Sequence, residues 1–177
     1  YDSARGSFKD FLIDNVFNKE KIQDIEVISP YFSNDTSLLD FLKKRVEREC
    51  RFLLPTRRNN EVQISEDLFN ELKEAGLLWS NWSEIDRQGE ARNIHAKVYR
   101  FYGQKKCYTI VGSVNFTKPA WNGYSPSNNE NNLESAVLYR ENAIAVNPIL
   151  RPATVGQLEK LAFIEIESLE DNEDLTF

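Results

Sequence analysis

The sequence predicts an α/β domain with a mixed central β-sheet flanked by helices on both faces. Segments with helical spacing of apolar residues alternate with short β-type segments through the first half of the chain, which favours parallel strands. Later, two strand-like segments are joined by the polar stretch Gly103-Gln104-Lys105-Lys106, which is typical of an antiparallel hairpin. With 177 residues, of which 41% are hydrophobic, the chain can bury the core of one such domain.

The first half is expected to follow the order helix, strand, helix, strand, helix. These elements are predicted at residues 7–17, 24–33, 36–46, 50–54 and 65–78. Asp35 or Thr36 is expected to cap the second helix, and Pro55 to stop the second strand. Ser65 is expected to cap the third helix. The inner face of that helix is predicted to comprise Leu68, Phe69, Leu72, Leu77 and Leu78.

The second half is expected to contain the hairpin, a short helix and a final strand. These elements are predicted at residues 94–102, 107–111, 115–121 and 133–139. Residues 122–132, rich in Gly, Ser, Pro and Asn, are predicted to form a loop on the rim of any pocket. We therefore divide the chain into a folded domain at 1–146 and a C-terminal linker with an acidic tail at 147–177, with a short helix around 155–161.

Charge and hydropathy exclude several classes of protein. A formal net charge of -6 argues against a strong non-specific grip on a polyanion, because long-range attraction follows overall charge. Acidic residues crowd the C-terminal end, so the remainder is closer to neutral and is compatible with a local basic cleft. No apolar run approaches the roughly 20 residues of a membrane span, and the first residues do not resemble a secretory signal. We expect a cytoplasmic protein that does not bind membranes.

The cysteines give no sign of redox or metal chemistry. Cys50 and Cys107 are far apart and lack the spacing of a CxxC pair or a zinc site, so they are expected to be buried thiols. Acidic residues are plentiful, but they form no tight cluster with His or Cys that suggests a cation site, and no cofactor is expected. The chain starts with Tyr1 and contains no Met, which is typical of an excised domain or a processed chain.

A short constellation in the second half carries the chemistry. His95, the only histidine, lies two residues before Lys97, and on a strand these side chains would project from the same face. Ser113 and Asn115 lie on a segment that can return beside them and open a helix, whose free N–H groups favour anions. A lone histidine is more often structural or superficial, but these neighbours favour a phosphate-binding function.

Three stretches resemble the phospholipase D superfamily. Residues 94–99 (IHAKVY), 111–117 (VGSVNFT) and 133–138 (LESAVL) resemble its HxK, its GSxN and its later glutamate, here Glu134. The family pattern places an aspartate five residues after the lysine, where this chain has Tyr102. The tyrosyl-DNA phosphodiesterase branch also omits that aspartate, so the departure points to a DNA-processing relative or to divergence. The resemblance implies a phospholipase D-like fold and a catalytic domain at 1–146.

The resemblance also implies a mechanism that needs no metal. One histidine attacks phosphorus to form a phosphohistidine, while a second histidine protonates the leaving oxygen and later activates water. Lys97 and Asn115 would bind the non-bridging oxygens, and Ser113 would assist them. Glu134 would orient a histidine ring, although an exposed strand carboxylate is an open alternative.

The single histidine leaves this site half complete. Either two copies meet about a two-fold axis or a second half lies elsewhere in the full protein, and we favour the homodimer. The resemblance implies a phosphodiesterase, acting as a nuclease or DNA-end-processing module. Nucleic acid is preferred to lipid because no amphipathic membrane-binding stretch is present. One alternative is an inactive module that binds nucleic acid or dimerises, and a lipid phosphodiesterase is another.

Four residues outside the motifs are weaker candidates for binding nucleic acid. Arg57 and Arg58 follow a predicted strand and could contact the backbone, although solvated surface charge is the simpler interpretation. Tyr31 and Trp121 could stack on bases, although aromatic core packing is the more frequent use of such residues.

Overall fold

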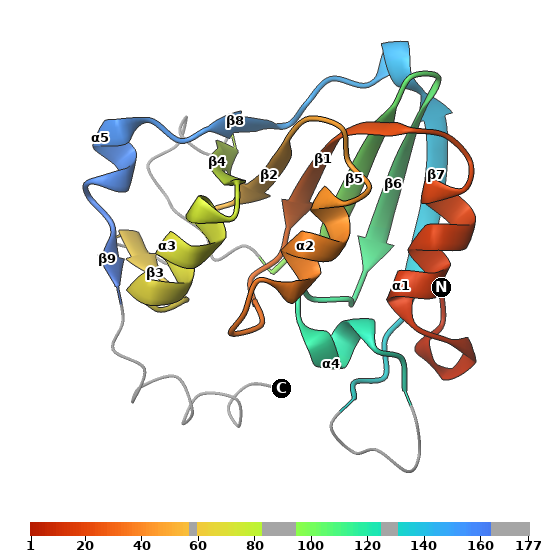
Figure 1. Ribbon diagram of the computed structural model, residues 1–177, viewed down its shortest axis with the longest axis horizontal. Helices are drawn as coiled ribbons and strands as arrows, with labels where there is room; N and C mark the ends of the chain where they lie inside the picture. The colour runs from red at the N-terminus through yellow and green to blue at the C-terminus, as the bar shows by residue number, and fades with distance from the viewer. Residues whose placement is uncertain (57–59, 83–94, 125–130, 164–177) are drawn as a thin grey trace.

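The protein, described here from a computed structural model, has a seven-stranded mixed sheet at its centre. The structure describes residues 1–56, 60–82, 95–124 and 131–163. The strands of the sheet are β1 (Ile22–Ile28), β2 (Cys50–Leu53), β4 (Leu77–Trp82), β5 (Val98–Gly103), β6 (Lys106–Gly112), β7 (Ala136–Asn142) and β8 (Leu150–Pro152). Their order is β7-β6-β5-β1-β2-β4-β8 (Figure 1). β1, β2 and β4 are parallel and the other neighbours antiparallel, which confirms the predicted α/β class and mixed sheet.

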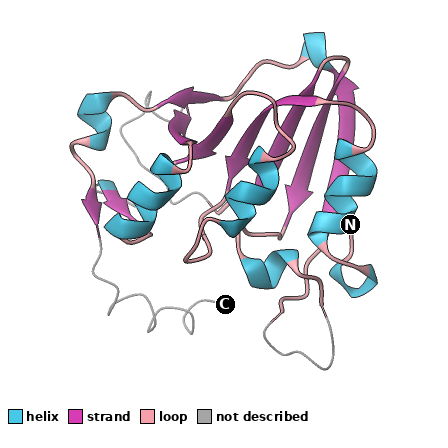
Figure 2. Cartoon of the chain, in the orientation of Figure 1, coloured by secondary structure: helices cyan, strands magenta, loops and turns pink. Residues whose placement is uncertain are grey.

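Short helices accompany the sheet. They are α1 (Phe8–Leu12), continued by a π-helical turn at Ile13–Phe17, α2 (Ser37–Lys43), α3 (Glu66–Glu74), α4 (Lys118–Trp121) and α5 (Val155–Leu158). Single 3-10 turns occur at Ser3–Arg5 and Ala143–Ala145. A separate parallel pair joins β3 (Glu61–Val62) to β9 (Ala162–Phe163). Figure 2 shows α1, α2 and α3 in front of the strands, on the same side of the sheet.

The core lies on the face that these helices cover. Helices α1 to α4 bury residues in one apolar cluster that includes Tyr99 and Phe101 of β5. Arg100 and Tyr102, which alternate with them along β5, lie on the opposite face because successive side chains of a strand point to opposite sides. Within the described residues the two faces are therefore covered unequally, with α1 to α4 on one of them. The other face of β5 carries Arg100 and Tyr102 together with Val98, which packs against a smaller apolar cluster of Ile28, Leu53 and Leu150.

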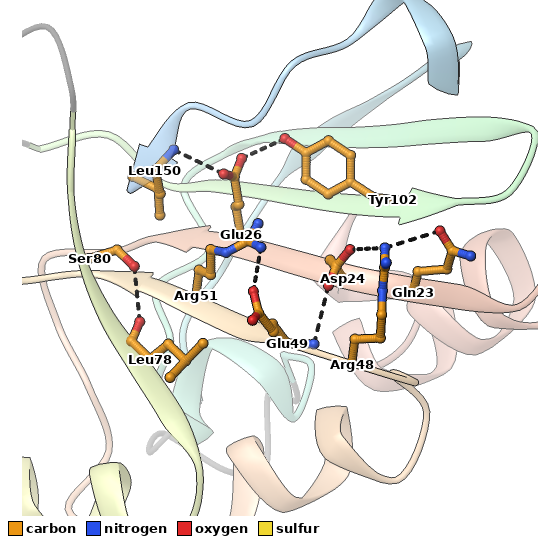
Figure 3. Close-up of polar contacts among 10 residues, drawn as sticks. All are labelled: Gln23, Asp24, Glu26, Arg48, Glu49, Arg51, Leu78, Ser80, Tyr102 and Leu150. Atoms are coloured by element: carbon orange, nitrogen blue, oxygen red, sulfur yellow. Dashed lines mark hydrogen bonds and ion pairs between the residues drawn. The ribbon is translucent and has the colours of Figure 1, made fainter. Parts of the chain in front are cut away.

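A buried carboxylate organises the other face. Glu26 of β1 is 1% exposed, and it accepts hydrogen bonds from the Tyr102 hydroxyl (2.5 Å) and the Leu150 amide (2.9 Å), as Figure 3 shows. The Ile149 amide donates to it at 3.2 Å, and Arg100 approaches it at 3.6 Å. These contacts hold the chain after β7 against the sheet, where Leu150 begins β8. Residues 150–152 are therefore a sheet strand rather than a free linker, and the domain division at residue 146 stays a prediction.

The third predicted helix ends earlier than expected. Leu77 and Leu78 do not belong to the inner face of α3 but begin β4, parallel to β2. Helix α3 ends at Glu74, and Gly76 follows it with φ +93°, a conformation that glycine adopts without strain and that commonly ends helices. The glycine was the sequence signal for this boundary.

Candidate active site

The motif residues gather at one edge of the sheet. At this edge the parallel strands β1, β2 and β4 reach their carboxyl ends, β6 ends at Gly112, and β5 and β7 begin; α4 lies beside it (Figure 1). Ligands of open α/β sheets commonly bind at the carboxyl ends of the parallel strands. The edge is therefore the place where these segments can meet around a substrate.

Lys97 and His95 lie just before β5 rather than inside it. The predicted strand started at residue 94, whereas β5 starts at Val98. Lys97 still continues the ladder, because its carbonyl accepts a hydrogen bond from the Gly112 amide at 3.3 Å, and so it keeps the same side of the sheet as Tyr99. His95 is exposed and precedes this bond, so the strand alone does not set the direction of its ring.

Ser113 and Glu134 form the best-defined part of the site. The Ser113 hydroxyl donates to Glu134 Oε2, and it accepts a hydrogen bond from the Ser135 amide at 3.0 Å. The Ser113 amide in turn donates to the Ser135 carbonyl at 2.9 Å. A Cβ at Gly112 would lie 2.2 Å from that carbonyl oxygen, so glycine permits the close approach of the two segments.

The position of Glu134 excludes the alternative of an exposed strand carboxylate. It is 6% exposed, and Asn132 Nδ2 donates to its Oε1 at 3.3 Å. Burial lowers the pKa of the Lys97 ammonium below its usual value, while the Glu134 carboxylate opposes this shift. The two charges therefore attract each other, and the site combines a partly desolvated ammonium with a buried carboxylate.

The N-terminal segment holds Glu134 in place. The Ser3 hydroxyl accepts a hydrogen bond from the Glu134 amide at 2.7 Å, and the Ser3 amide donates to the Glu134 carbonyl at 2.9 Å. The Ala136 amide donates to the Tyr1 carbonyl at 3.1 Å, so the pairing continues for two more residues. Sequence reasoning missed Ser3, because no pattern in the chain links positions more than 130 residues apart.

Asn115 is fixed through its backbone neighbours. The Val114 carbonyl accepts a hydrogen bond from the Tyr99 hydroxyl at 3.1 Å, and the Phe116 amide donates to Ser29 Oγ at 2.9 Å. Among the described residues the Asn115 Oδ1 atom is buried without a hydrogen-bond partner. Because buried polar atoms are usually paired, this carboxamide is a candidate for contact with a group outside the described chain.

The weaker candidates fare differently. Trp121 is 0% exposed and packs against Phe8, Tyr99 and Phe116, so the prediction that it stacks on bases is wrong; α4 turns its ring into the core. Tyr31 is 46% exposed and stays a candidate. Arg57 and Arg58 lie outside the described residues.

A family comparison decides the classification. Residues 15–146, which include all three motif stretches, match the family model described as "Cardiolipin synthase, PLD-like domain". The chain belongs to this phospholipase D-like family. The superfamily predicted from HxK and GSxN is thereby confirmed, and the PLD-like domain is a member of the phosphodiesterase superfamily.

The matches to solved structures are weaker than the match to the family model. One mutant of yeast tyrosyl-DNA phosphodiesterase matches 65% of this chain and 25% of its own length, at 17% identity and a TM-score of 0.33. A second mutant of that enzyme matches 75% of this chain and 27% of its own, at 14% identity and a TM-score of 0.37. The chain thus spans about a quarter of these proteins. A comparison with curated protein sequences finds no significant match.

The described residues offer neither a cluster of metal ligands nor a membrane-spanning helix. Within the residues that the structure describes, no group of three or more His, Cys, Asp or Glu side chains could hold a metal ion. Over the same residues, no helix has the length and apolar character needed to cross a membrane.

Proposed function

We propose that this domain is a metal-independent phosphodiesterase, acting as a nuclease or DNA-end-processing module through a phosphohistidine. The main support is the placement of Lys97, Ser113 and Glu134 at one sheet edge, with His95 two residues before the lysine. A partly desolvated ammonium attracts a phosphate oxygen more strongly than an exposed one, because less water screens its charge.

The proposed reaction proceeds in two displacements. An imidazole nitrogen attacks phosphorus, and a nitrogen–phosphorus bond forms as the bond to the leaving oxygen breaks. A second imidazole protonates that oxygen, then accepts a proton from the water that cleaves the phosphohistidine. The Lys97 ammonium and the Nδ2–H group of Asn115 donate hydrogen bonds to the non-bridging oxygens and stabilise the charge growing on them. Glu134, held by Ser113, orients the imidazole of His95.

Because this chain has one histidine, the second imidazole comes from another half. We favour a homodimer in which each copy contributes His95, Lys97 and Asn115; a second half within a longer protein serves equally in chemical terms. Sedimentation of the active species distinguishes them. Activity carried by a monomer without a second such half would contradict the two-imidazole mechanism.

DNA is the proposed substrate, and lipid is the second candidate. The departure at Tyr102 and the resemblance to the tyrosyl-DNA phosphodiesterase branch favour DNA, whereas the words "Cardiolipin synthase" in the family description favour a lipid phosphodiester. Parallel incubation with single-stranded DNA, RNA and anionic phospholipid vesicles separates the substrates. Binding of DNA without cleavage of any of them would favour the alternative of an inactive binding module.

The decisive experiment uses an activated diester, bis(4-nitrophenyl) phosphate, in the presence of EDTA. We expect release of nitrophenol by the full-length protein, its loss in His95→Ala, and its retention in Gln104→Ala, an exposed change in the hairpin turn. Activity that depends on an added divalent ion, or that survives His95→Ala, would contradict the mechanism.

Trapping of the intermediate gives an independent check. After acid-free quenching at short reaction times, phosphate attached to His95 should be labile in acid and stable in base. Phosphate found on a serine or tyrosine instead would contradict a histidine nucleophile.

A further inference from the structure

The buried hydroxyl of Tyr99 joins three parts of the candidate site. Tyr99 belongs to β5, two residues after Lys97 and on the same side of the sheet. Its hydroxyl donates to the Val114 carbonyl at 3.1 Å and accepts a hydrogen bond from the Trp121 indole N–H at 3.2 Å. Strand β5, helix α4 and the segment that follows β6 therefore meet at this one oxygen atom.

The bonded carbonyl has a particular place in the chain. Val114 lies between Ser113 and Asn115, so its carbonyl is part of the peptide unit that leads directly into Asn115. The Tyr99 hydroxyl thus ties the strand that follows the HxK motif to the backbone of the GSxN motif. The other hydrogen bonds of this segment lead elsewhere. Ser113 is bonded to Ser135, just before β7, and Phe116 to Ser29, in the loop after β1.

We propose that Tyr99 is a positioning residue, whose hydroxyl sets the Asn115 carboxamide relative to Lys97. This inference rests on the proposed function. Among the described residues no hydrogen bond holds the Asn115 side chain, and its buried Oδ1 atom has no partner, so the position of the carboxamide depends on the backbone that carries it. The backbone at this point is held to the lysine strand by the Tyr99 bond.

The surroundings make this bond hard to replace. Tyr99 and Trp121 are both buried, and the hydrogen bonds between them and to Val114 are buried as well. Removing the hydroxyl would leave a carbonyl and an indole N–H unsatisfied in a region closed to solvent, which costs more than an exposed hydrogen bond. Burial also raises the pKa of the Tyr99 phenol, so it stays protonated and able to donate.

The same strand offers a matched control. Tyr102 is also a buried tyrosine of β5 whose hydroxyl donates a hydrogen bond, but it lies on the opposite face and bonds Glu26. Tyr99→Phe and Tyr102→Phe each remove one phenolic hydroxyl from the same strand. Only the first change breaks a contact with the motif segment.

The test compares kcat and KM of the two variants with bis(4-nitrophenyl) phosphate, at a temperature where circular dichroism shows both folded. For Tyr99→Phe we expect a roughly 10-fold lower kcat with KM within about twofold, because the misplaced carboxamide acts on the transition state. For Tyr102→Phe we expect an unchanged kcat. An unchanged kcat in Tyr99→Phe, or equal losses in both variants, would overturn the proposal.

A double substitution separates positioning from general loosening. If Tyr99 acts through Asn115, the pair Tyr99→Phe/Asn115→Ala should have the kcat of Asn115→Ala alone, since the second change removes what the first misplaces. Losses that multiply would contradict action through Asn115. Should Tyr99→Phe fail to fold, Trp121→Phe removes the indole N–H and is expected to lower kcat in the same direction by roughly threefold; an unchanged kcat there would count against the proposal.

Hydrogen exchange tests the tether without using activity. We expect faster exchange of the Asn115 and Phe116 amides in Tyr99→Phe than in either the unmodified protein or Tyr102→Phe. If the unmodified protein cleaves no diester but this exchange difference is found, the proposed function fails and the positioning of the segment stands. If diester cleavage is found without any exchange difference, the inference about Tyr99 fails alone.

Discussion

The two faces of β5 use buried polar groups in opposite ways. On one face, Arg100 and Tyr102 surround Glu26, whose carboxylate accepts hydrogen bonds from a hydroxyl and two amides beside an arginine. On the other, Tyr99 anchors the segment that bears Asn115, while the Asn115 Oδ1 atom lacks a partner among the described residues. Polar groups whose hydrogen bonds are all made favour stability, whereas an unpaired acceptor can still receive a hydrogen bond from a group outside the described residues. Substitutions on the two faces should therefore change different quantities.

After the loss of activity expected for His95→Ala, Lys97→Ala should give the largest effect on the site face. In the proposed mechanism the change removes the ammonium that stabilises the growing phosphate charge, so we expect kcat to fall by about 100- to 1000-fold. Steady-state hydrolysis of the diester in EDTA measures it. Lys105→Ala, an exposed change in the hairpin turn, is the control. A loss below about 10-fold would remove Lys97 from the proposed mechanism.

Glu26→Gln should give the largest effect on the opposite face. It leaves Arg100, which is mostly buried, without its charge partner, and we expect a loss of about 3 kcal/mol in the free energy of unfolding. Urea denaturation measures the loss, and the exposed Glu141→Gln on β7 is the control. A change in kcat without a change in stability would break the distinction between the faces.

Ser3→Ala sharpens the comparison on the site side. It removes the acceptor of the Glu134 amide, so we expect a loss of about 1–2 kcal/mol in stability together with faster exchange of that amide. The exposed Ser135→Ala serves as control and should stay within about 0.5 kcal/mol. Normal protection of the Glu134 amide in Ser3→Ala would show that the N-terminal segment does not hold this strand.

The smallest expected effect concerns the pKa of Lys97. The Glu134 carboxylate favours the charged ammonium, so Glu134→Gln should lower the pKa of Lys97 further below its ordinary value. The ammonium would then lose its proton at lower pH, and the alkaline limb of kcat would move in the same direction. Titration of the assigned Lys97 side-chain resonance measures the shift directly. A shift to higher pH would contradict the influence of Glu134.

Local patterns predicted much of the fold. The apolar spacing at residues 7–17 and the capping Ser65 correspond to α1 with its π-helical turn and to α3. The hairpin around Gly103 is present as well. The prediction fails at Leu77, because an apolar Leu-Leu pair satisfies a helical or a strand pattern equally, and only the helix end at Gly76 separates this pair from α3.

The sequence by itself determined which residues make up the candidate site and to which superfamily the chain belongs. The spacing of His95, Lys97, Ser113, Asn115 and Glu134 is a property of the chain, and it was sufficient to predict the superfamily. Only the tertiary structure decided how these residues are supported: Ser3 on Glu134, Tyr99 on Val114, and Trp121 in the core rather than at the surface. Such contacts join positions far apart in the sequence, and they arise only when strands pair and helices pack, so no local pattern contains them.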